Sequence, residues 1–256
     1  QKEIKEVNTG IICFDKGKLK ACIGEIKPNN KKKEFYLTDI IHIFYKKGYI
    51  IDGIKLADFE EALGINSGVE LARANTIMQK RINERLMKGG VAIIDPGSTF
   101  ISFGVKIGEG TVIYPFTIIE KDVKIGNRCS IGPFAHLREG TRIDSDVVVG
   151  NFLEIVRSKL SPKILAKHFG YIGDSRIGKG VNIGAGTVTA NFDGRAKGMT
   201  VIKQGAFIGS DTVLVAPVKI GRNAVTGAGS VVVKRQNIPD NAVVAGVPAK
   251  PLKRNR

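Results

Sequence analysis

The 256-residue chain contains no tryptophan, only three methionines and only three cysteines, and aromatic residues make up 7% of it. Cys13, Cys22 and Cys129 are odd in number and scattered, which argues against a disulfide framework, and no spacing resembles a zinc site. No apolar run reaches the roughly 20 residues that a membrane-spanning helix needs, and no leader precedes the first motif. We therefore expect a cytoplasmic protein that has no metal site of its own and does not contact membranes.

Charge of one sign dominates what is present: 40 basic residues against 24 acidic ones give a net charge of +16. Such a surplus favours an anionic partner, either nucleic acid, a membrane surface or phosphorylated small molecules, and general lysine richness is the alternative explanation. No recognition helix, RNA-binding signature or interleaving of aromatic and basic residues is present, so nucleic acid is a minor hypothesis.

Branched aliphatic residues recur at every sixth position along two stretches. Helices repeat their apolar face every 3.6 residues and strands every two, so a period of six indicates a parallel β-helix with three short strands per coil. The residue four places further on is usually small or β-branched, as the corner of a triangular coil requires. The first array is Ile101, Ile107, Ile113, Ile119, Ile125, Ile131, Leu137, Ile143, Val149 and Ile155, and the second is Ile202, Ile208, Leu214, Ile220, Thr226, Val232, Ile238 and Val244.

The register lapses between the two arrays and returns only at Ile177 and Ile183. Coils of a solenoid contact only their neighbours, so inserted segments project as loops and commonly carry the function. The sequence therefore predicts two inserted segments, residues 158–171 and 192–200. Periodicity alone is also compatible with a scaffold that has no chemistry.

The first 90 residues follow a different pattern. We expect strands over residues 11–14 and 49–56 and a helix over 38–47. Ser67 and Glu70 form a capping box for a long helix that ends before Gly89. The predicted domains are an α/β remnant of a larger domain (1–66), a linking helix (67–90) and a β-helix (91–256), which makes the chain mostly β.

Several motifs carry a resemblance to a known family. They are residues 131–138 (IGPFAHLR), 149–152 (VGNF), 168–174 (HFGYIGD), 182–187 (NIGAGT) and 209–218, together with 6–10 and 34–39 nearer the start. These motifs resemble the bacterial bifunctional N-acetylglucosamine-1-phosphate uridylyltransferase and glucosamine-1-phosphate N-acetyltransferase. The resemblance covers nearly the whole chain and implies the acetyltransferase half, preceded by the end of the nucleotidyltransferase-like domain. It also implies a left-handed β-helix and a homotrimer with sites between subunits.

The chemistry of acetyl transfer suggests which residues to look for. A sugar amine attacks a thioester only as the free base, so the site needs a proton acceptor, donors for the oxyanion and cations for a sugar phosphate. A lone histidine is more often structural than catalytic, but His168 lies in a predicted insertion and matches the family's general base. Arg138 offers a planar fork for a phosphate and matches the family's arginine, although it could equally be a surface charge.

The resemblance assigns the remaining site residues. Tyr171 and Asn182 match sugar-binding positions, and Lys197 matches a lysine that reaches the substrate from the neighbouring subunit. The positions along the acetyl-CoA groove are Asn191, Ser210, Ala228, which would act through its backbone, and Gly246, which lies close to where the family has an arginine.

The chain departs from the family at Val156, where a phosphate-binding lysine is usual, and at Phe192, where the family has tyrosine. Arg157 follows Val156, but adjacent side chains of a strand point to opposite faces. The resemblance thus implies an N-acetyltransferase that uses acetyl-CoA and glucosamine 1-phosphate in UDP-N-acetylglucosamine and peptidoglycan synthesis. The alternatives are an acyltransferase for another amino sugar and a non-catalytic trimeric module that binds polyanions. The family's nucleotide-binding loop and magnesium-binding aspartate are missing, so we expect no uridylyl transfer and no use of magnesium.

Overall fold

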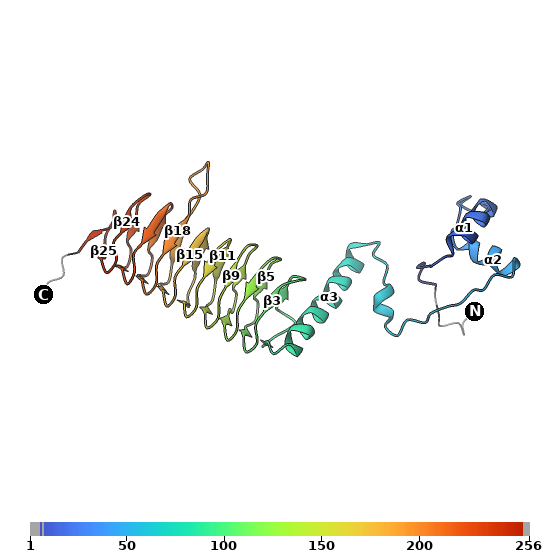
Figure 1. Cartoon of the computed structure of the whole chain (residues 1–256), viewed down its shortest axis with the longest axis horizontal. Helices are drawn as coiled ribbons and strands as arrows, with labels where there is room; N and C mark the ends of the chain where they lie inside the picture. Colours follow the sequence, from blue (N-terminus) through green and yellow to red (C-terminus); the bar gives the residue numbers. More distant parts are fainter. Residues whose placement is uncertain (1–5, 7, 253–256) are drawn as a thin grey trace. The chain divides into compact units, whose positions relative to one another are not determined.

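The computed structural model describes residue 6 and residues 8–252 (Figure 1). The chain divides into two compact units, Gln1–Leu71 and Ala72–Arg256. Helix α3 (Gly68–Lys88) starts in the first unit and continues into the second. In the described residues, no helix is long and apolar enough to cross a membrane.

The first unit is helical. It contains α1 (Lys16–Cys22), η1 (Ile23–Glu25), α2 (Asp39–Lys46) and η2 (Phe59–Ala62). Its small core consists of Cys22, Ile26, Ile40 and Phe44, and the ring of Phe44 meets the edges of two further aromatic rings. The prediction of α2 is confirmed.

The two strands predicted in the first unit are wrong. Residues 11–14 and 49–56 form no strand, and the described part of this unit contains no β-strand. An extended segment becomes a strand only when a neighbouring segment satisfies its backbone groups. Here Phe14 and Tyr49 pack their rings on Phe44 of α2 instead. The predicted α/β character of residues 1–66 is therefore corrected to helices and connecting segments.

Helix α3 begins with the predicted capping box. The backbone N–H of Glu70 donates to Ser67 Oγ at 3.3 Å, and Glu70 Oε2 accepts from the backbone N–H of Asn66 at 2.7 Å. These bonds satisfy N–H groups that the first turn of a helix leaves free. At its other end, Ile82 and Leu86 are buried in the core of the second unit. The later turns of α3 thus close the first coil of the β-strands that follow.

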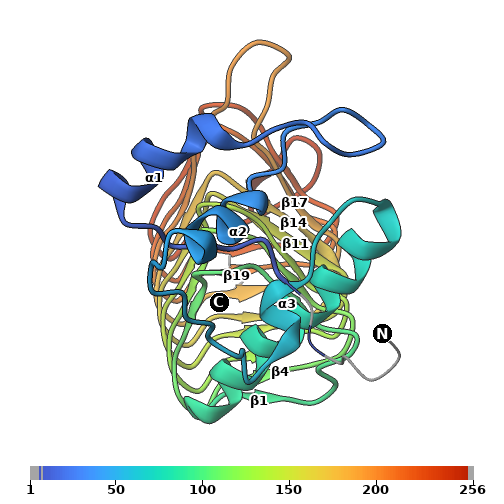
Figure 2. The ribbon, with the colours of Figure 1, turned by 90° about the vertical axis from the view of Figure 1, so that its right-hand side faces the viewer.

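The second unit is a parallel β-solenoid with three sheets, and Figure 2 looks along its stack of coils. The predicted fold class, a mostly β parallel helix of hexapeptide repeats, is confirmed. We call the sheets face A, face B and face C, and the edges between them AB, BC and CA. Face A contains β1 (Ala92–Ile93), β4 (Val112–Ile113), β7 (Ser130–Ile131), β10 (Val148–Val149), β13 (Leu165–Ala166), β16 (Asn182–Ile183), β19 (Phe207–Ile208), β22 (Val225–Thr226), β25 (Val243–Ala245) and the antiparallel β26 (Lys250–Pro251).

The other two sheets have eight strands each. Face B contains β2 (Phe100–Ile101), β5 (Ile118–Ile119), β8 (His136–Leu137), β11 (Leu153–Val156), β14 (Gly170–Gly173), β17 (Thr187–Ala190), β20 (Val213–Val215) and β23 (Val231–Val232). Face C contains β3 (Lys106–Ile107), β6 (Lys124–Ile125), β9 (Arg142–Ile143), β12 (Lys159–Leu160), β15 (Ser175–Ile177), β18 (Thr200–Ile202), β21 (Val218–Ile220) and β24 (Asn237–Ile238).

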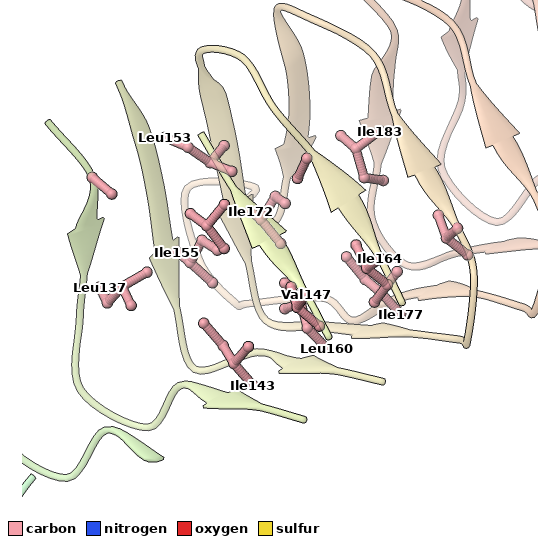
Figure 3. Packing of buried hydrophobic residues seen from close by; sticks show 14 of the residues in the cluster. Leu137, Ile143, Val147, Leu153, Ile155, Leu160, Ile164, Ile172, Ile177 and Ile183 are labelled. Carbon is pink, nitrogen blue, oxygen red and sulfur yellow. The ribbon is translucent and has the colours of Figure 1, made fainter. Parts of the chain in front are cut away.

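One inward residue per strand builds the core. Ile155 of β11 pairs in register with Leu137 of the coil before it and Ile172 of the coil after it, and all three are at most 1% exposed. Figure 3 shows these side chains stacked along the inside of the solenoid. Burial of about 25 cal/mol per Å² of apolar surface in every coil is the main stabilisation of such a stack.

The first predicted insertion is wrong. Residues 158–171 contain β12, β13 and the start of β14, and Val148 pairs with Leu165, 17 positions on, where regular coils such as that from Val112 to Ser130 take 18. Inward residues are five apart from Ile155 to Leu160 and from Ile172 to Ile177. Two successive coils therefore each lack one residue at edge BC, which shifts the six-residue register without adding a loop.

The second predicted insertion is confirmed. Val188 of β17 pairs with Val213 of β20, 25 positions on. The extra residues follow Asn191 and form a loop, drawn in orange in Figure 1, that projects from the stack at edge BC. A single antiparallel bridge between Phe192 and Lys197 closes the loop on itself.

Candidate functional site

Four of the predicted site residues lie along edge AB. His168 follows β13, Ser210 follows β19, Ala228 follows β22 and Gly246 follows β25, and all four are exposed. The His168 side chain makes no hydrogen bond to the described residues, so its imidazole is open to a ligand. Edge AB is therefore an exposed line that carries the predicted base and three predicted coenzyme positions.

Close approach of the coils fixes the backbone around His168. The backbone N–H of Gly186 donates to the carbonyl of Phe169 at 2.8 Å. On the other side, Gly150 lies so close to Lys167 that a Cβ on it would overlap the Lys167 carbonyl group and approach its Cα to 2.7 Å. Only glycine fits at this position, and it holds the corner that presents His168.

Edge AB also carries an aromatic ladder that the sequence analysis missed. Phe116, Phe134 and Phe152 stack with ring centroids 4.9 Å apart, and each lies in the left-handed region with φ between 54° and 59°. Their spacing of 18 residues was the available signal. The ladder forms an exposed apolar ledge that leads along the edge towards Phe169.

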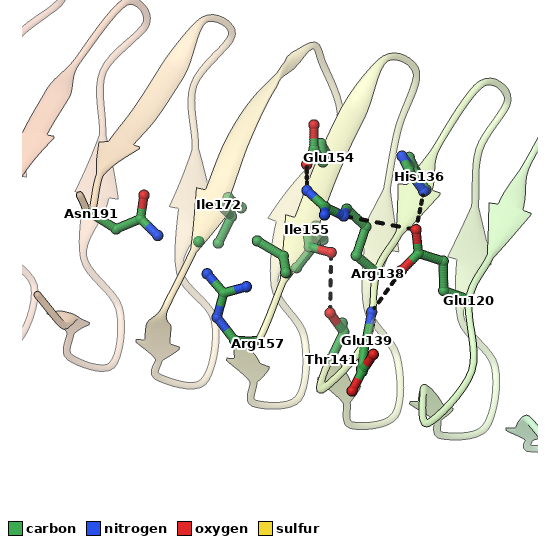
Figure 4. Close-up of polar contacts among 12 residues, drawn as sticks. Glu120, His136, Arg138, Glu139, Thr141, Glu154, Ile155, Arg157, Ile172 and Asn191 are labelled. Atoms are coloured by element: carbon green, nitrogen blue, oxygen red, sulfur yellow. Dashed lines mark hydrogen bonds and ion pairs between the residues drawn. The ribbon is translucent and has the colours of Figure 1, made fainter. Parts of the chain in front are cut away.

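Arg138 lies on face B in a network of charges (Figure 4). Its Nη1 donates to Glu154 Oε1 at 2.7 Å, and its Nε lies 3.7 Å from Glu120 Oε1. The hydrogen bond to Glu154 raises the pKa of Arg138. Arg138 therefore has two carboxylate neighbours, neither of which the sequence analysis identified.

Glu120 connects this network to a histidine. Its Oε1 is 2.9 Å from His136 Nε2, and its Oε2 accepts from the backbone N–H of Glu139 at 3.2 Å. Burial raises the pKa of Glu120, but these two hydrogen bonds and the charge of Arg138 outweigh it, so the pKa lies below its usual value. His136 is thus engaged by a carboxylate.

A second cluster lies at edge BC. Arg157 binds Asp174 through two parallel bonds, Nε to Oδ1 at 2.6 Å and Nη2 to Oδ2 at 2.8 Å, and Asn191 Nδ2 also donates to Asp174 Oδ2. The hydrogen bonds from Arg157 are the first cause that lowers the pKa of Asp174, and the charge of Lys197 lowers it further. Arg157 is committed to this bidentate pair and does not replace the lysine missing at Val156.

Tyr171 joins this cluster across a glycine. A Cβ on Gly173 would lie 2.5 Å from the Tyr171 hydroxyl and 2.7 Å from Asn191 Nδ2, so both side chains lie over Gly173. The Tyr171 hydroxyl also interacts with Arg157. The fold thus brings together Tyr171 and Asn191, with the exposed Lys197 close enough to influence Asp174.

Two residues do not fit a site on one face. Asn182 lies on face A, where it pairs with Leu165 and Phe207, whereas Tyr171 and Arg138 project from face B. Val156, at the position of the family's lysine, is 2% exposed and pairs with Gly173. A single chain therefore leaves Asn182 apart from the other predicted sugar-binding residues.

The solenoid has a large hollow elsewhere. A groove of about 940 Å³ lies between α3 and the first coil, lined by residues such as Met78, Phe100 and Phe103. None of the predicted site residues lines it. Among the described residues, no group of three or more His, Cys, Asp or Glu side chains could hold a metal ion.

Comparison with known proteins agrees with the repeat and with the motifs. The family described as bacterial transferase hexapeptide (six repeats) matches residues 104–139, 122–157 and 199–234. The bifunctional protein GlmU of Thermosipho africanus is 45% identical over 96% of this chain and 60% of its own length, and that of Carboxydothermus hydrogenoformans is 42% identical over 95% and 61%. The chain thus spans about 60% of the length of these curated relatives.

Solved structures share the fold at low sequence identity. The UDP-N-acetylglucosamine acyltransferase of Francisella novicida is 16% identical, with a TM-score of 0.46 over 64% of this chain and 70% of its own. The corresponding enzyme of Campylobacter jejuni is 19% identical, with a TM-score of 0.46 over 63% and 74%.

Proposed function

The chain carries the bacterial transferase hexapeptide repeat and resembles, along nearly its whole length, part of the bifunctional GlmU proteins, and on this premise we propose that it is an N-acetyltransferase. Its proposed reaction transfers acetyl from acetyl-CoA to the amine of glucosamine 1-phosphate. The observation that carries the proposal is the alignment of His168, Ser210, Ala228 and Gly246 along one exposed edge. A base and a coenzyme groove on a common line suit a reaction between two bound substrates.

In this proposal His168 accepts the proton that the sugar amine loses as its nitrogen bonds to the thioester carbon. The imidazole is exposed and carries no competing hydrogen bond within the described residues, so it can meet the amine directly. The coenzyme would lie along edge AB, where Ser210 offers a hydroxyl and Ala228 offers a backbone N–H. A backbone N–H aimed at the thioester oxygen would stabilise the oxyanion that forms in the transition state.

Arg138 is the proposed phosphate ligand, and its surroundings qualify that role. Glu154 and Glu120 already neutralise much of its charge, so a phosphate has to compete with them. The buried Val156 adds no cation. These observations favour a second candidate, an acyltransferase of the same kind whose acceptor is an amino sugar with no phosphate at C1.

We further propose a homotrimer with sites between chains. Asn182 projects from face A and Tyr171 from face B, so face A of one subunit against face B of the next would bring both to one sugar. The loop that carries Lys197 projects from the stack and could reach a neighbouring subunit in the same way. Sedimentation that finds a stable monomer would contradict this assembly.

The decisive experiment measures thiol release from acetyl-CoA with a panel of amino sugars. His168→Ala should lower kcat by about 10²- to 10⁴-fold, the usual range for a positioned base, with KM for acetyl-CoA unchanged. His42→Ala removes an exposed histidine of the first unit and should leave kcat unchanged. A His168→Ala enzyme with near-normal kcat would remove the histidine from the mechanism.

Arg138→Ala separates the two candidate acceptors. If Arg138 holds a phosphate, KM for glucosamine 1-phosphate should rise much more than KM for acetyl-CoA. Arg128→Ala, which removes an arginine paired with Asp146 at edge CA, is the matched control. Faster turnover of unphosphorylated glucosamine than of glucosamine 1-phosphate in the parent would favour the second acceptor class.

A further inference from the structure

Face C carries a row of basic side chains that the proposed acetyl transfer does not use. In successive strands of this sheet the inward residue is a buried or part-buried aliphatic, and the residue before it, which points outward, is basic in six of the eight strands. The first five of these cations are direct register neighbours along the stack. We call this set the cationic row: Lys106, Lys124, Arg142, Lys159, Arg176 and Lys219.

The other two faces lack such a row. The corresponding outward residues of face A are all uncharged, from Ala92 and Val112 to Val225 and Val243. On face B only His136 and Glu154 can carry charge at these positions. General lysine richness would distribute basic residues over all three faces, so the concentration on face C needs another explanation.

The row is almost unpaired. Arg142 binds Asp122, with Nη2 to Oδ1 at 2.9 Å, and the other five members make no ion pair with any described residue. Neighbouring strands of a sheet lie about 4.8 Å apart, and like charges directly opposite each other at this spacing are destabilising. The row therefore opposes folding in the free chain, and a bound anion would relieve the repulsion.

The shape of the row selects among anions. It is one residue wide, and over the six steps from β3 to β21 it extends about 29 Å at the usual strand spacing. Acidic side chains lie at both bordering edges, with Asp122 and Glu139 at edge BC and Glu109 and Asp144 at edge CA. These carboxylates would repel a broad anionic surface such as a membrane, but a narrow chain along the row avoids them.

The composition of face C also argues against nucleic acid. Proteins that bind single strands combine cations with aromatic side chains on which bases stack. No outward position of the eight strands on this face is aromatic, since the two that are not basic are Val201 and Asn237. The geometry points to a linear chain of phosphate groups without bases, of the chemistry of inorganic polyphosphate, bound along the cationic row of face C.

The test compares two triple variants of the full chain that lose the same charge. K124Q/K159Q/R176Q removes three cations from the row, and K27Q/K31Q/K32Q removes three exposed lysines from loops of the first unit. Binding of labelled linear polyphosphate is measured at several salt concentrations. Counterion release gives a slope of log K against log salt of about −0.7 per phosphate neutralised on a single strand, hence about −4 for six contacts and about −2 after three are lost.

We expect the row variant to bind weakly with the shallower slope, and the loop variant to match the parent. Acetyl transfer and folding provide independent readouts, because the row variant should keep its kcat and should melt no lower than the parent once repulsion is relieved. Equal weakening in both variants would overturn the proposal, because binding would then follow net charge alone. Tighter binding of anionic lipid vesicles or of single-stranded DNA of matched charge than of polyphosphate would overturn it as well.

Discussion

The substitution Gly150→Ala tests how tightly the coils pack beneath the candidate base. The new Cβ would overlap the carbonyl group of Lys167 and lie 2.7 Å from its Cα, whereas ordinary contacts begin near 3.4 Å. The backbone of Lys167 must therefore withdraw by about 1 Å, and the neighbouring residue in the chain is His168. Overpacking of this kind usually costs about 1–3 kcal/mol.

Two measurements follow from that displacement. A loss of 1 kcal/mol lowers the melting temperature of a chain of this size by about 2–4 °C, so thermal unfolding should show a drop of several degrees. A displacement of about 1 Å at a reacting group can lower the rate by roughly 10²-fold, so acetyl transfer should fall more than stability alone explains. The matched control is Gly97→Ala on the same edge, where the new Cβ meets only Asp95 Oδ1 at 3.4 Å. An unchanged melting temperature for Gly150→Ala would refute the close approach, and normal kcat in a destabilised variant would separate this corner from the chemistry.

Three further predictions concern the rest of the chain. Ile155→Ala should destabilise the solenoid by about 2–5 kcal/mol in denaturant titrations, because it leaves a cavity between the inward residues Leu137 and Ile172. Because the pKa of Asp174 is lowered in the fold, chiefly by Arg157, its stabilisation is present above the unfolded pKa of about 3.9 and is lost as pH falls through the folded pKa. The melting temperature of the parent should consequently fall more steeply between pH 5 and 3 than that of Asp174→Asn, and parallel curves would show that the pair contributes nothing. Of the three thiols, only the exposed Cys13 should react with a thiol reagent in the native state, since Cys22 and Cys129 are buried and burial raises the pKa of Cys129, and a count above one before unfolding would contradict the described core.

The repeat was the most predictable part of the molecule, because a buried aliphatic at each inward position is an energetic requirement of every coil. The predicted corner residues of the first array, from Val105 to Val147, are all buried as expected. The strands predicted over 11–14 and 49–56 failed for the opposite reason. Whether an apolar segment becomes a strand depends on a pairing partner, and periodicity within the segment carries no information about that partner.

The site was predictable only in part, for a related reason. Periodicity did not assign roles to His168 or Ser210, which came from the family resemblance, whereas the charge pairs could have been inferred from spacing. Arg138 meets residues 16 and 18 positions away, Glu154 and Glu120, which is the distance between adjacent coils. A coil length of 17 or 18 residues is therefore enough to predict such pairs from the sequence alone.

The breaks in the repeat give the strongest link between fold and site. Edge BC is one residue short in two successive coils, at Arg157 and at Asp174, both of which take positive φ, and it carries a loop in the third coil after Asn191. The two shortened corners place Arg157 against Asp174, and the loop follows directly from the residue that binds the same carboxylate. A solenoid without function would gain nothing from three successive departures at one edge, since each gives up regular stacking. His168, by contrast, lies on a regular corner, so the reasoning that placed it in an insertion was wrong even though the structure leaves it exposed. The irregular edge BC would therefore shape the sugar side of the site, and the regular edge AB would supply the base and a straight path for the coenzyme.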